Sequence, residues 1–451
     1  MNKKKYLPIE IPRDYWYFVE PYPQEMKDKL KGYIDSCLAE GKWQHSEDIL
    51  FDETITDVNF LAYSIHKSVA PLKNPMPGHG LEQAFAPFKK KSHDFLPAGF
   101  QLEKNYTFAA VGDLMATPYL RESADKLYER VETLMFDSDL LFGNLESSLT
   151  AVKEGIYSAK EGEGPKVNVD IDEYNTLVKH KGKQLDVVQL TNNHVLDCGF
   201  EGIDLTMKQL KKDGIVFVGA YETEADAGRV KTTFLDDIKI GWVSHTFSFN
   251  GRPLVEGKEW LADRTRFHCE ENPDTSRIEG QIAACREAGC DLIVLALHWG
   301  QEHEMYPHPD QLKWAHQFAE LGADVIIGHH PHVCQPVEIY TPKSRPNVSV
   351  PIMYSLGNVT PPTSGAISIM SMIARIGLAK GTVNGERKVS VARLELTPVA
   401  VVLEQDQERK IVRAVPLIEI LASDLDADTR EYFNVTAEAA ELVLGKNWSG
   451  S

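Results

Sequence analysis

The stretch Asp324-Val-Ile-Ile-Gly-His-His-Pro-His332 joins a short apolar run to a cluster of histidines. The same arrangement, an apolar run followed by a small or polar cluster, recurs elsewhere in the chain. The other apolar runs are residues 107–111, 139–142, 186–190, 291–297 and 352–355. Runs of this length and composition are typical of buried strands.

Helical patterns lie between several of these strands, at residues 118–136, 202–212, 276–288 and 310–321. Alternation of strands and helices predicts an α/β fold with a largely parallel sheet in layers. Four more strands are expected at 366–376, 389–396, 399–404 and 410–416, and a helix at about 426–444. These later strands suit an antiparallel or mixed sheet.

The chain divides into three parts. Residues 1–104 form an N-terminal extension of unknown role, with several prolines between 71 and 77 that indicate a connecting stretch. Residues 105–380 contain all the recurring strand ends. Residues 381–451 add strands and a helix, which we expect to complete the same domain.

Composition limits the classes of function. The 451 residues carry a net charge of −18, which argues against a nucleic-acid partner because phosphate neutralisation needs a basic surface. No apolar run reaches the roughly 20 residues that cross a bilayer. The six cysteines lack CxxC spacing, which is typical of reduced thiols. The segment after Met1 carries prolines and charges, whereas the corresponding part of an export signal is apolar. We therefore expect no transmembrane segment and a cytoplasmic location.

Polar side chains at the strand ends are the candidate site. Taken singly, each has an ordinary explanation, such as a helix cap for an aspartate or a turn for Asn193. Together they form a nitrogen and oxygen donor set that suits Zn²⁺, Mn²⁺ or Fe. The candidate site residues are Asp113, Glu146, Asn193, His194, His298 and the histidines at 329, 330 and 332.

Six ordered motifs resemble the CapA (poly-γ-glutamate capsule biosynthesis) family, a branch of the calcineurin-like metallophosphoesterase superfamily. The resemblance covers roughly residues 105 to 365. The motifs are Gly112-Asp-Leu-Met115, Asn144-Leu-Glu146, Asn192-Asn-His194 with Asp197, His298-Trp-Gly300 with Glu302, Gly328-His-His-Pro-His332 and Ser355-Leu-Gly-Asn358. The resemblance implies a four-layer α/β/β/α sandwich with two divalent metal ions (Mn, Fe or Zn) at one edge.

The resemblance also implies roles for individual residues. The implied metal ligands are Asp113, Glu146, Asn193, His298, His330 and His332. Among them, Glu146 takes the place of a bridging aspartate, and His329 lies behind His330 and His332. His194, oriented by Asp197, is the candidate general acid, whose alternative reading is a residue at a helix start. The sequence departs from the superfamily where histidine is expected, because position 115 is methionine. A thioether is a poor ligand for hard ions, so the second metal position is the less certain one.

Two classes of function follow. The first is a metal-dependent hydrolase or transferase acting on a phosphoester or a glutamyl amide, with a small molecule or polyglutamate as substrate. The second is a non-catalytic, polymer-binding accessory protein of capsule biosynthesis. Substrate specificity is expected from polar loops, since arginines can bind carboxylates or phosphates. The candidate substrate-binding residues are Glu302, Arg264, Arg266 and Asn358.

Overall fold

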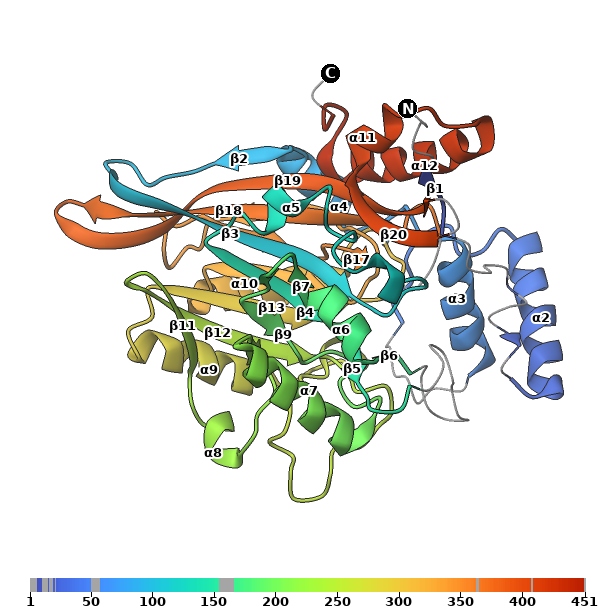
Figure 1. The fold of residues 1–451 in the computed structure, drawn as a ribbon, viewed down its shortest axis with the longest axis horizontal. Helices are drawn as coiled ribbons and strands as arrows, with labels where there is room; N and C mark the ends of the chain where they lie inside the picture. Colours follow the sequence, from blue (N-terminus) through green and yellow to red (C-terminus); the bar gives the residue numbers. More distant parts are fainter. Residues whose placement is uncertain are drawn as a thin grey trace.

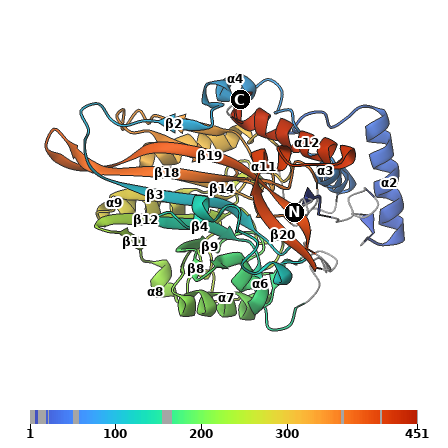
Figure 2. The same cartoon turned by 45° about the horizontal axis from the view of Figure 1, so that its top comes forward.

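The computed structural model describes residues 6–9, 15, 19–20, 22–49, 57–153, 166–361, 365–406 and 409–449. Within these residues, two β-sheets pack face to face and helices cover both outer faces (Figure 1). Figure 2 shows the same layers after a rotation, with the longest strands crossing the molecule. The predicted four-layer α/β/β/α sandwich is confirmed.

The first sheet has ten strands among the described residues. Its parallel part runs β3-β4-β9-β10, β17 pairs in parallel with β3, and β18 and β19 extend it in antiparallel fashion. β1, β2 and β20 all pair with β19. The strands are β1 (Tyr6–Leu7), β2 (Ser92–Asp94), β3 (Gln101–Leu114), β4 (Leu140–Leu145), β9 (Val187–Gln189), β10 (Val216–Val218), β17 (Asn358–Thr360), β18 (Met370–Val383), β19 (Glu386–Asp406) and β20 (Arg409–Pro416).

The second sheet has six strands in the described part of the chain, in the order β11-β12-β13-β14-β16-β15. Its central strands are parallel and its two edge strands are antiparallel. The strands are β11 (Lys231–Leu235), β12 (Ile238–Thr246), β13 (Leu292–His298), β14 (Val325–His329), β15 (Val337–Tyr340) and β16 (Val350–Met353). Two small ribbons, β5 (Ser148–Leu149) with β6 (Asn168–Val169) and β7 (Lys179–His180) with β8 (Lys183–Gln184), lie outside both sheets.

Alternation along the strands divides the apolar side chains between the layers. Phe108 of β3 faces the second sheet, while the next residue, Ala109, faces the outer helices. Phe142 stacks on Trp242 of β12 with 5.4 Å between ring centroids, which joins the two sheets. Both sheets are therefore buried on two faces, as the near-continuous apolar runs predict.

Helices α6 (Ile171–Val178) and α7 (Gly199–Asp213) cover the first sheet, and α9 (Ser276–Glu287) and α10 (Pro309–Leu321) cover the second. Helix α7 ends at Gly214, whose φ of 76° fits a glycine C-cap. The helices predicted at 202–212, 276–288 and 310–321 are confirmed. Further helices are α4 (Leu81–Phe85), α5 (Glu132–Met135), α8 (Glu224–Ala227), α11 (Leu417–Leu421) and α12 (Ala427–Leu444).

The helix predicted over residues 118–136 is wrong. Only α5 and a short 3-10 turn form there, and Tyr119 and Asp125 adopt φ of 62° and 55°, which interrupt a helix. The segment is held by β20, because Ala414 N donates to Leu127 O (2.7 Å) and Val412 N donates to Ser123 Oγ (2.8 Å). Tertiary hydrogen bonds thus override a helical pattern.

The N-terminal extension contains α2 (Gln24–Ala39) and α3 (Val58–Val69), which share a small apolar core of their own. Both helices lie at one end of the sandwich in Figure 1 and in Figure 2. Strands β1 and β2 tie the extension to β19. Strands β19 and β20, from the C-terminal part, belong to the same sheet as β3.

Gly112 lies where two backbone segments approach closely. A Cβ atom at this position would lie 2.0 Å from Gly357 O, and Asp113 N donates to that same carbonyl (2.9 Å). We expect Gly112→Ala to lower the free energy of unfolding by about 2–3 kcal/mol, because the backbone must move to relieve the clash. Urea unfolding followed by circular dichroism measures this, and Gly32→Ala in α2, where no atom lies within 4 Å, is the control. Equal stability of both variants would contradict the expectation.

Candidate metal centre

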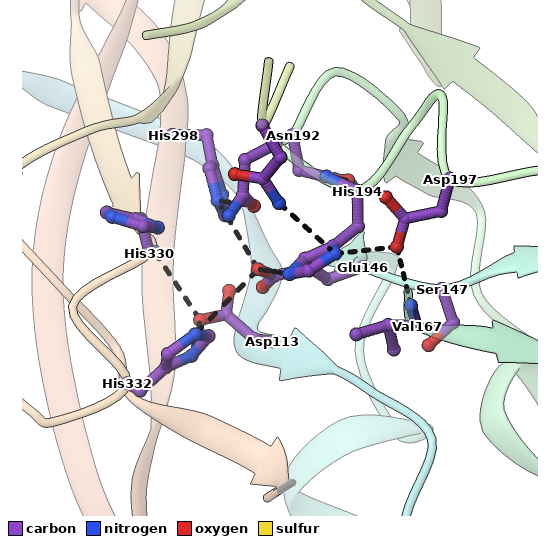
Figure 3. Close-up of polar contacts among 12 residues, drawn as sticks. Asp113, Glu146, Ser147, Val167, Asn192, His194, Asp197, His298, His330 and His332 are labelled. Carbon is purple, nitrogen blue, oxygen red and sulfur yellow. Dashed lines mark hydrogen bonds and ion pairs between the residues drawn. The ribbon is translucent and has the colours of Figure 1, made fainter. Parts of the chain in front are cut away.

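Side chains from the ends of both sheets converge at one edge of the sandwich. Asp113 is on β3, Glu146 follows β4, and Asn193 and His194 follow β9, all in the first sheet. The second sheet contributes His298 at the end of β13 and the histidines that end and follow β14. These side chains are all buried. Figure 3 shows the histidines of the second sheet on one side of Asp113 and Glu146, and His194 with Asp197 on the other.

The Asp113 carboxylate is the most heavily bonded group of the cluster. It accepts from Asn144 Nδ2 (2.8 Å), lies 2.8 Å from His329 Nδ1, and accepts from His330 N (3.4 Å). Burial alone would raise its pKa, but the hydrogen bonds and charges of His329 and His332 hold the pKa of Asp113 well below its usual range. Asp113 is therefore a carboxylate ion in the core of the protein.

Glu146 presents one oxygen to three imidazoles. Its Oε1 lies 3.4 Å from His298 Nε2, 4.0 Å from His194 Nε2 and 4.0 Å from His332 Nε2. This buried oxygen accepts no hydrogen bond among the described residues. Burial and then the Asp113 carboxylate raise the pKa of Glu146 to about 8. A buried acceptor surrounded by ring nitrogens, without a hydrogen bond of its own, is a donor arrangement that fits a cation.

Two sets of ligand atoms fit metal ions, and Glu146 belongs to both. One set is Glu146, His330 and His332, and the other is Asp113, Glu146 and His298, with the atoms of each set within 4.8 Å of one another. Asn193 Oδ1 joins the second set, because it lies 2.8 Å from His298 Nε2. Nitrogen and carboxylate donors in these numbers suit Zn²⁺, Mn²⁺ or Fe. The residues present thus fit a divalent ion.

His332 is oriented by an amide on its far side. Its Nδ1 lies 3.0 Å from Asn358 Oδ1, and Asn358 Nδ2 donates to His332 O (3.1 Å). This leaves Nε2 directed at Glu146 and at Glu302, whose Oε1 is 3.9 Å away. Burial lowers the pKa of His332, but Glu146, Asp113 and Glu302 together outweigh it and raise the pKa to about 10. Asn358 therefore orients a ring of the cluster, which is the usual function of a group behind a metal ligand.

The backbone carrying the closing histidines is strained. His330 and His332 have φ of 98° and 55°, in the left-handed region that residues with a Cβ rarely adopt. The His330 ring packs against Phe247, with 4.4 Å between centroids. Burial holds the pKa of His330 well below its usual range, so the ring is neutral and able to donate a lone pair. Strain of this kind is found where a site fixes its side chains.

His194 is hydrogen-bonded on the side away from Glu146. Its Nδ1 lies 2.7 Å from Asp197 Oδ2, and that oxygen also accepts from Val167 N (2.5 Å). Arg252 Nη1 lies 2.9 Å from the other carboxylate oxygen of Asp197. Burial opposes a charge on His194, yet the Asp197 carboxylate outweighs burial and raises the pKa of the imidazole. Asp197 therefore orients the His194 ring through this contact.

Met115 packs in the apolar layer between the first sheet and its helices, and its N–H donates to Thr360 Oγ1 (2.7 Å). The two candidate substrate arginines contact an aromatic ring and a carboxylate outside the two candidate ligand sets. Arg264 is exposed, with its guanidinium 5.2 Å from the Phe249 ring centroid, and Arg266 pairs with Glu270 (2.8 Å). Their expected contact with substrate stays a prediction.

Sequence reasoning gave no role to two residues that join the site. Asn144 Nδ2 contacts Asp113, Glu146 Oε2 (3.2 Å) and His298 Nδ1 (3.3 Å). The spacing of Asn144 and Glu146 could have indicated that Asn144 faces the site, because residues two apart in extended backbone point the same way. No spacing in the sequence links Arg252 to the site, since its partner Asp197 lies on a different loop.

A four-layer sandwich with carboxylates, an amide and histidines at its sheet edge defines a metallophosphoesterase-like protein. Residues 107–361 match the family model described as "Bacterial capsule synthesis protein PGA_cap". The chain belongs to this family. The CapA family expected from the sequence motifs is thereby confirmed.

Curated relatives agree with this assignment. The PGA biosynthesis protein CapA of Bacillus subtilis (strain 168) is 28% identical over 333 residues, covering 72% of this chain and 79% of the relative. The capsule biosynthesis protein CapA of Bacillus anthracis is 27% identical, covering 61% of this chain and 62% of the relative. Among solved structures, the sulfate thiohydrolase SoxB of Termus thermophilus in complex with glycerol matches at 13% identity with a TM-score of 0.28, over 57% of this chain and 36% of that one. No helix in the described ranges is long and apolar enough to cross a membrane.

Proposed function

We propose that the chain is a metal-dependent hydrolase or transferase that acts on a phosphoester or a glutamyl amide in poly-γ-glutamate capsule metabolism. The observation that carries this proposal is the position of Glu146, which belongs to both candidate ligand sets and whose Oε1 faces three imidazoles. Family membership supports the polymer context, because the matching relatives are named for PGA and capsule biosynthesis.

In this proposal, six side chains would hold two divalent ions. They are Asp113, Glu146, Asn193, His298, His330 and His332. Bound ions of this kind supply Lewis acidity and lower the pKa of a bound water toward about 7. His194 would hold a proton at Nε2 and deliver it to the leaving group, while Asp197 keeps the ring in the required orientation. Arg252 pairs with the other carboxylate oxygen of Asp197. Glu302, at the open side of His332, would contact the substrate.

Metal analysis of the purified protein tests the proposal. We expect near-stoichiometric Mn, Fe or Zn, and turnover of at least one member of a panel of phosphoesters and γ-glutamyl peptides. The chelator-treated protein should lose this activity and regain it with Mn²⁺. A protein that binds no metal and turns over no substrate would contradict an enzyme and favour a polymer-binding accessory protein, which binding of poly-γ-glutamate would then reveal.

Metal binding should become tighter as pH rises. With the pKa of Glu146 raised to about 8 and that of His332 to about 10, both groups carry protons at neutral pH in the metal-free protein. A divalent ion must displace these protons, so its affinity should increase by at least about tenfold per pH unit between pH 6 and 8. Calorimetric Mn²⁺ titrations in two buffers of different ionisation enthalpy count the protons released.

The exposed variant Glu25→Gln on α2 serves as the control for this experiment and should show the same pH slope as the wild type. A dissociation constant that is flat between pH 6 and 8 would show that these groups are not displaced by the ion.

A further inference from the structure

The N-terminal extension contacts the loop that leaves the metal centre after His298. Leu72 N donates to His303 O (2.8 Å), and Met305 N donates to Leu72 O (2.9 Å). Residue 72 thus forms a parallel bridge with Glu304. Gln301 Nε2 also donates to Ile49 O (3.1 Å). The extension is therefore hydrogen-bonded to both ends of residues 301–305.

A buried ion pair reinforces this contact. Lys67, in the last turn of α3, lies 2.7 Å from Glu304 Oε1, and each side chain is only 3% exposed. The Lys67 ammonium also donates to Gln301 Oε1 (2.9 Å), and Tyr63 OH donates to Glu304 Oε1 (3.0 Å). A buried charge with several partners holds them firmly, because loss of one partner leaves an unpaired charge in the core. Lys67 therefore fixes the residues on both sides of Glu302 and His303.

Between these two anchors, the loop faces the metal centre. Glu302 Oε1 lies 3.9 Å from His332 Nε2, and the His303 and His332 ring centroids are 5.9 Å apart. His303 N donates to Pro331 O (2.8 Å), and the backbone of His303 is left-handed with φ of 59°. Gly300, which directly precedes residues 301–305, also has a positive φ, of 89°. The position of Glu302 thus depends on a loop whose unusual backbone is held from outside.

We propose that Lys67 and Tyr63 of the N-terminal extension are positioning residues of the metal centre, which place Glu302 beside His332 through Glu304 and Gln301. The inference rests on the proposed function and deepens it, because it makes the extension part of the site. With an ion held by His332, the carboxylate of Glu302 lies near the ion and increases its affinity by charge. Removing the support from α3 lets this carboxylate move away.

Hydrogen exchange tests the positioning without any metal. In the full chain carrying Lys67→Met, the amides of residues 300–305 should exchange at least about tenfold faster than in the wild type, because the loop loses its anchor. Lys73→Met is the matched control. Lys73 belongs to the same extension as Lys67, but it pairs with Glu438 (3.3 Å) at an exposed position. If Lys67→Met does not fold, Tyr63→Phe removes one hydrogen bond to Glu304 and should accelerate exchange in the same residues by a smaller factor. Unchanged protection in the folded variant would overturn the proposal.

Mn²⁺ affinity gives a second readout that a general loss of stability would not reproduce. Glu302→Gln should raise the Mn²⁺ dissociation constant by about tenfold, and Lys67→Met by a similar factor. The double variant Lys67→Met/Glu302→Gln should bind Mn²⁺ no more weakly than the weaker single variant, because both act through one carboxylate. Additive losses, or an unchanged constant in Lys67→Met, would overturn the proposal. A wild type that binds no Mn²⁺ would instead contradict the proposed function, and hydrogen exchange would then decide this inference alone.

Discussion

Replacing Asp113 by asparagine is expected to lower metal affinity by more than about a hundredfold and activity by about a thousandfold or more. The variant keeps the size of the side chain and can keep the bond from Asn144 Nδ2, but it removes a buried carboxylate whose pKa lies well below its usual range. His329 and His332 then lose the anion that they face at 2.8 and 3.6 Å. Two divalent ions in a buried site need these negative ligands to offset their charge.

Metal content by mass spectrometry of the purified protein and turnover on the identified substrate measure the two effects. Asp137→Asn is the control, because Asp137 makes an exposed pair with Lys183 (2.8 Å) on the surface. Thermal unfolding should show that the Asp113 variant is folded. Full metal occupancy in folded Asp113→Asn would show that the ions bind elsewhere.

Replacing His194 by asparagine should lower kcat by about 10²–10⁴-fold while metal content and KM stay close to the wild type. His194 belongs to neither candidate ligand set, and its Nε2 faces Glu146 at 4.0 Å from the side opposite the other histidines. Burial lowers the pKa of this imidazole, but Asp197 and then Glu146 raise it above its usual value, which favours the protonated form that a general acid needs. The rate in the variant should also lose its decline at high pH, because that decline follows deprotonation of the acid.

His316→Asn is the matched control, since His316 pairs with Glu338 (2.8 Å) on the half-buried side of α10. Asp197→Asn offers an independent measurement. An amide in place of the carboxylate cannot hold the imidazolium, so kcat should fall without loss of metal. A loss of bound metal in His194→Asn would assign this residue to the ligands instead.

The sequence was sufficient to predict where the site lies, because this depends on local patterns. Apolar runs followed by polar residues identify the carboxyl ends of parallel strands, where α/β sheets place their ligands. Asp113, Glu146 and His298 were found in this way, and they lie together in the structure. His330 and His332 were also predicted as ligands, and they form one candidate set with Glu146.

Contacts between distant segments could not be predicted from local patterns. The turn at residues 118–136 is determined by hydrogen bonds from β20, and only the folded sheet brings these segments together. Lys67 and Glu304 are 237 positions apart in the chain, and a lysine on an amphipathic helix is normally exposed. The pairing of Arg252 with Asp197 could not be predicted either, because the sequence of a polar loop does not indicate which segment the loop will contact.

The division of the donor groups between two sheets has a consequence for the order of folding. Asp113 and His329, which are 216 positions apart, meet only when the sheets have closed on each other. A divalent ion can therefore contact its full set of ligands only after the folding step that packs the two sheets against each other. Bound ions should then leave the refolding rate almost unchanged and slow unfolding instead, so they would protect the finished protein by extending its lifetime.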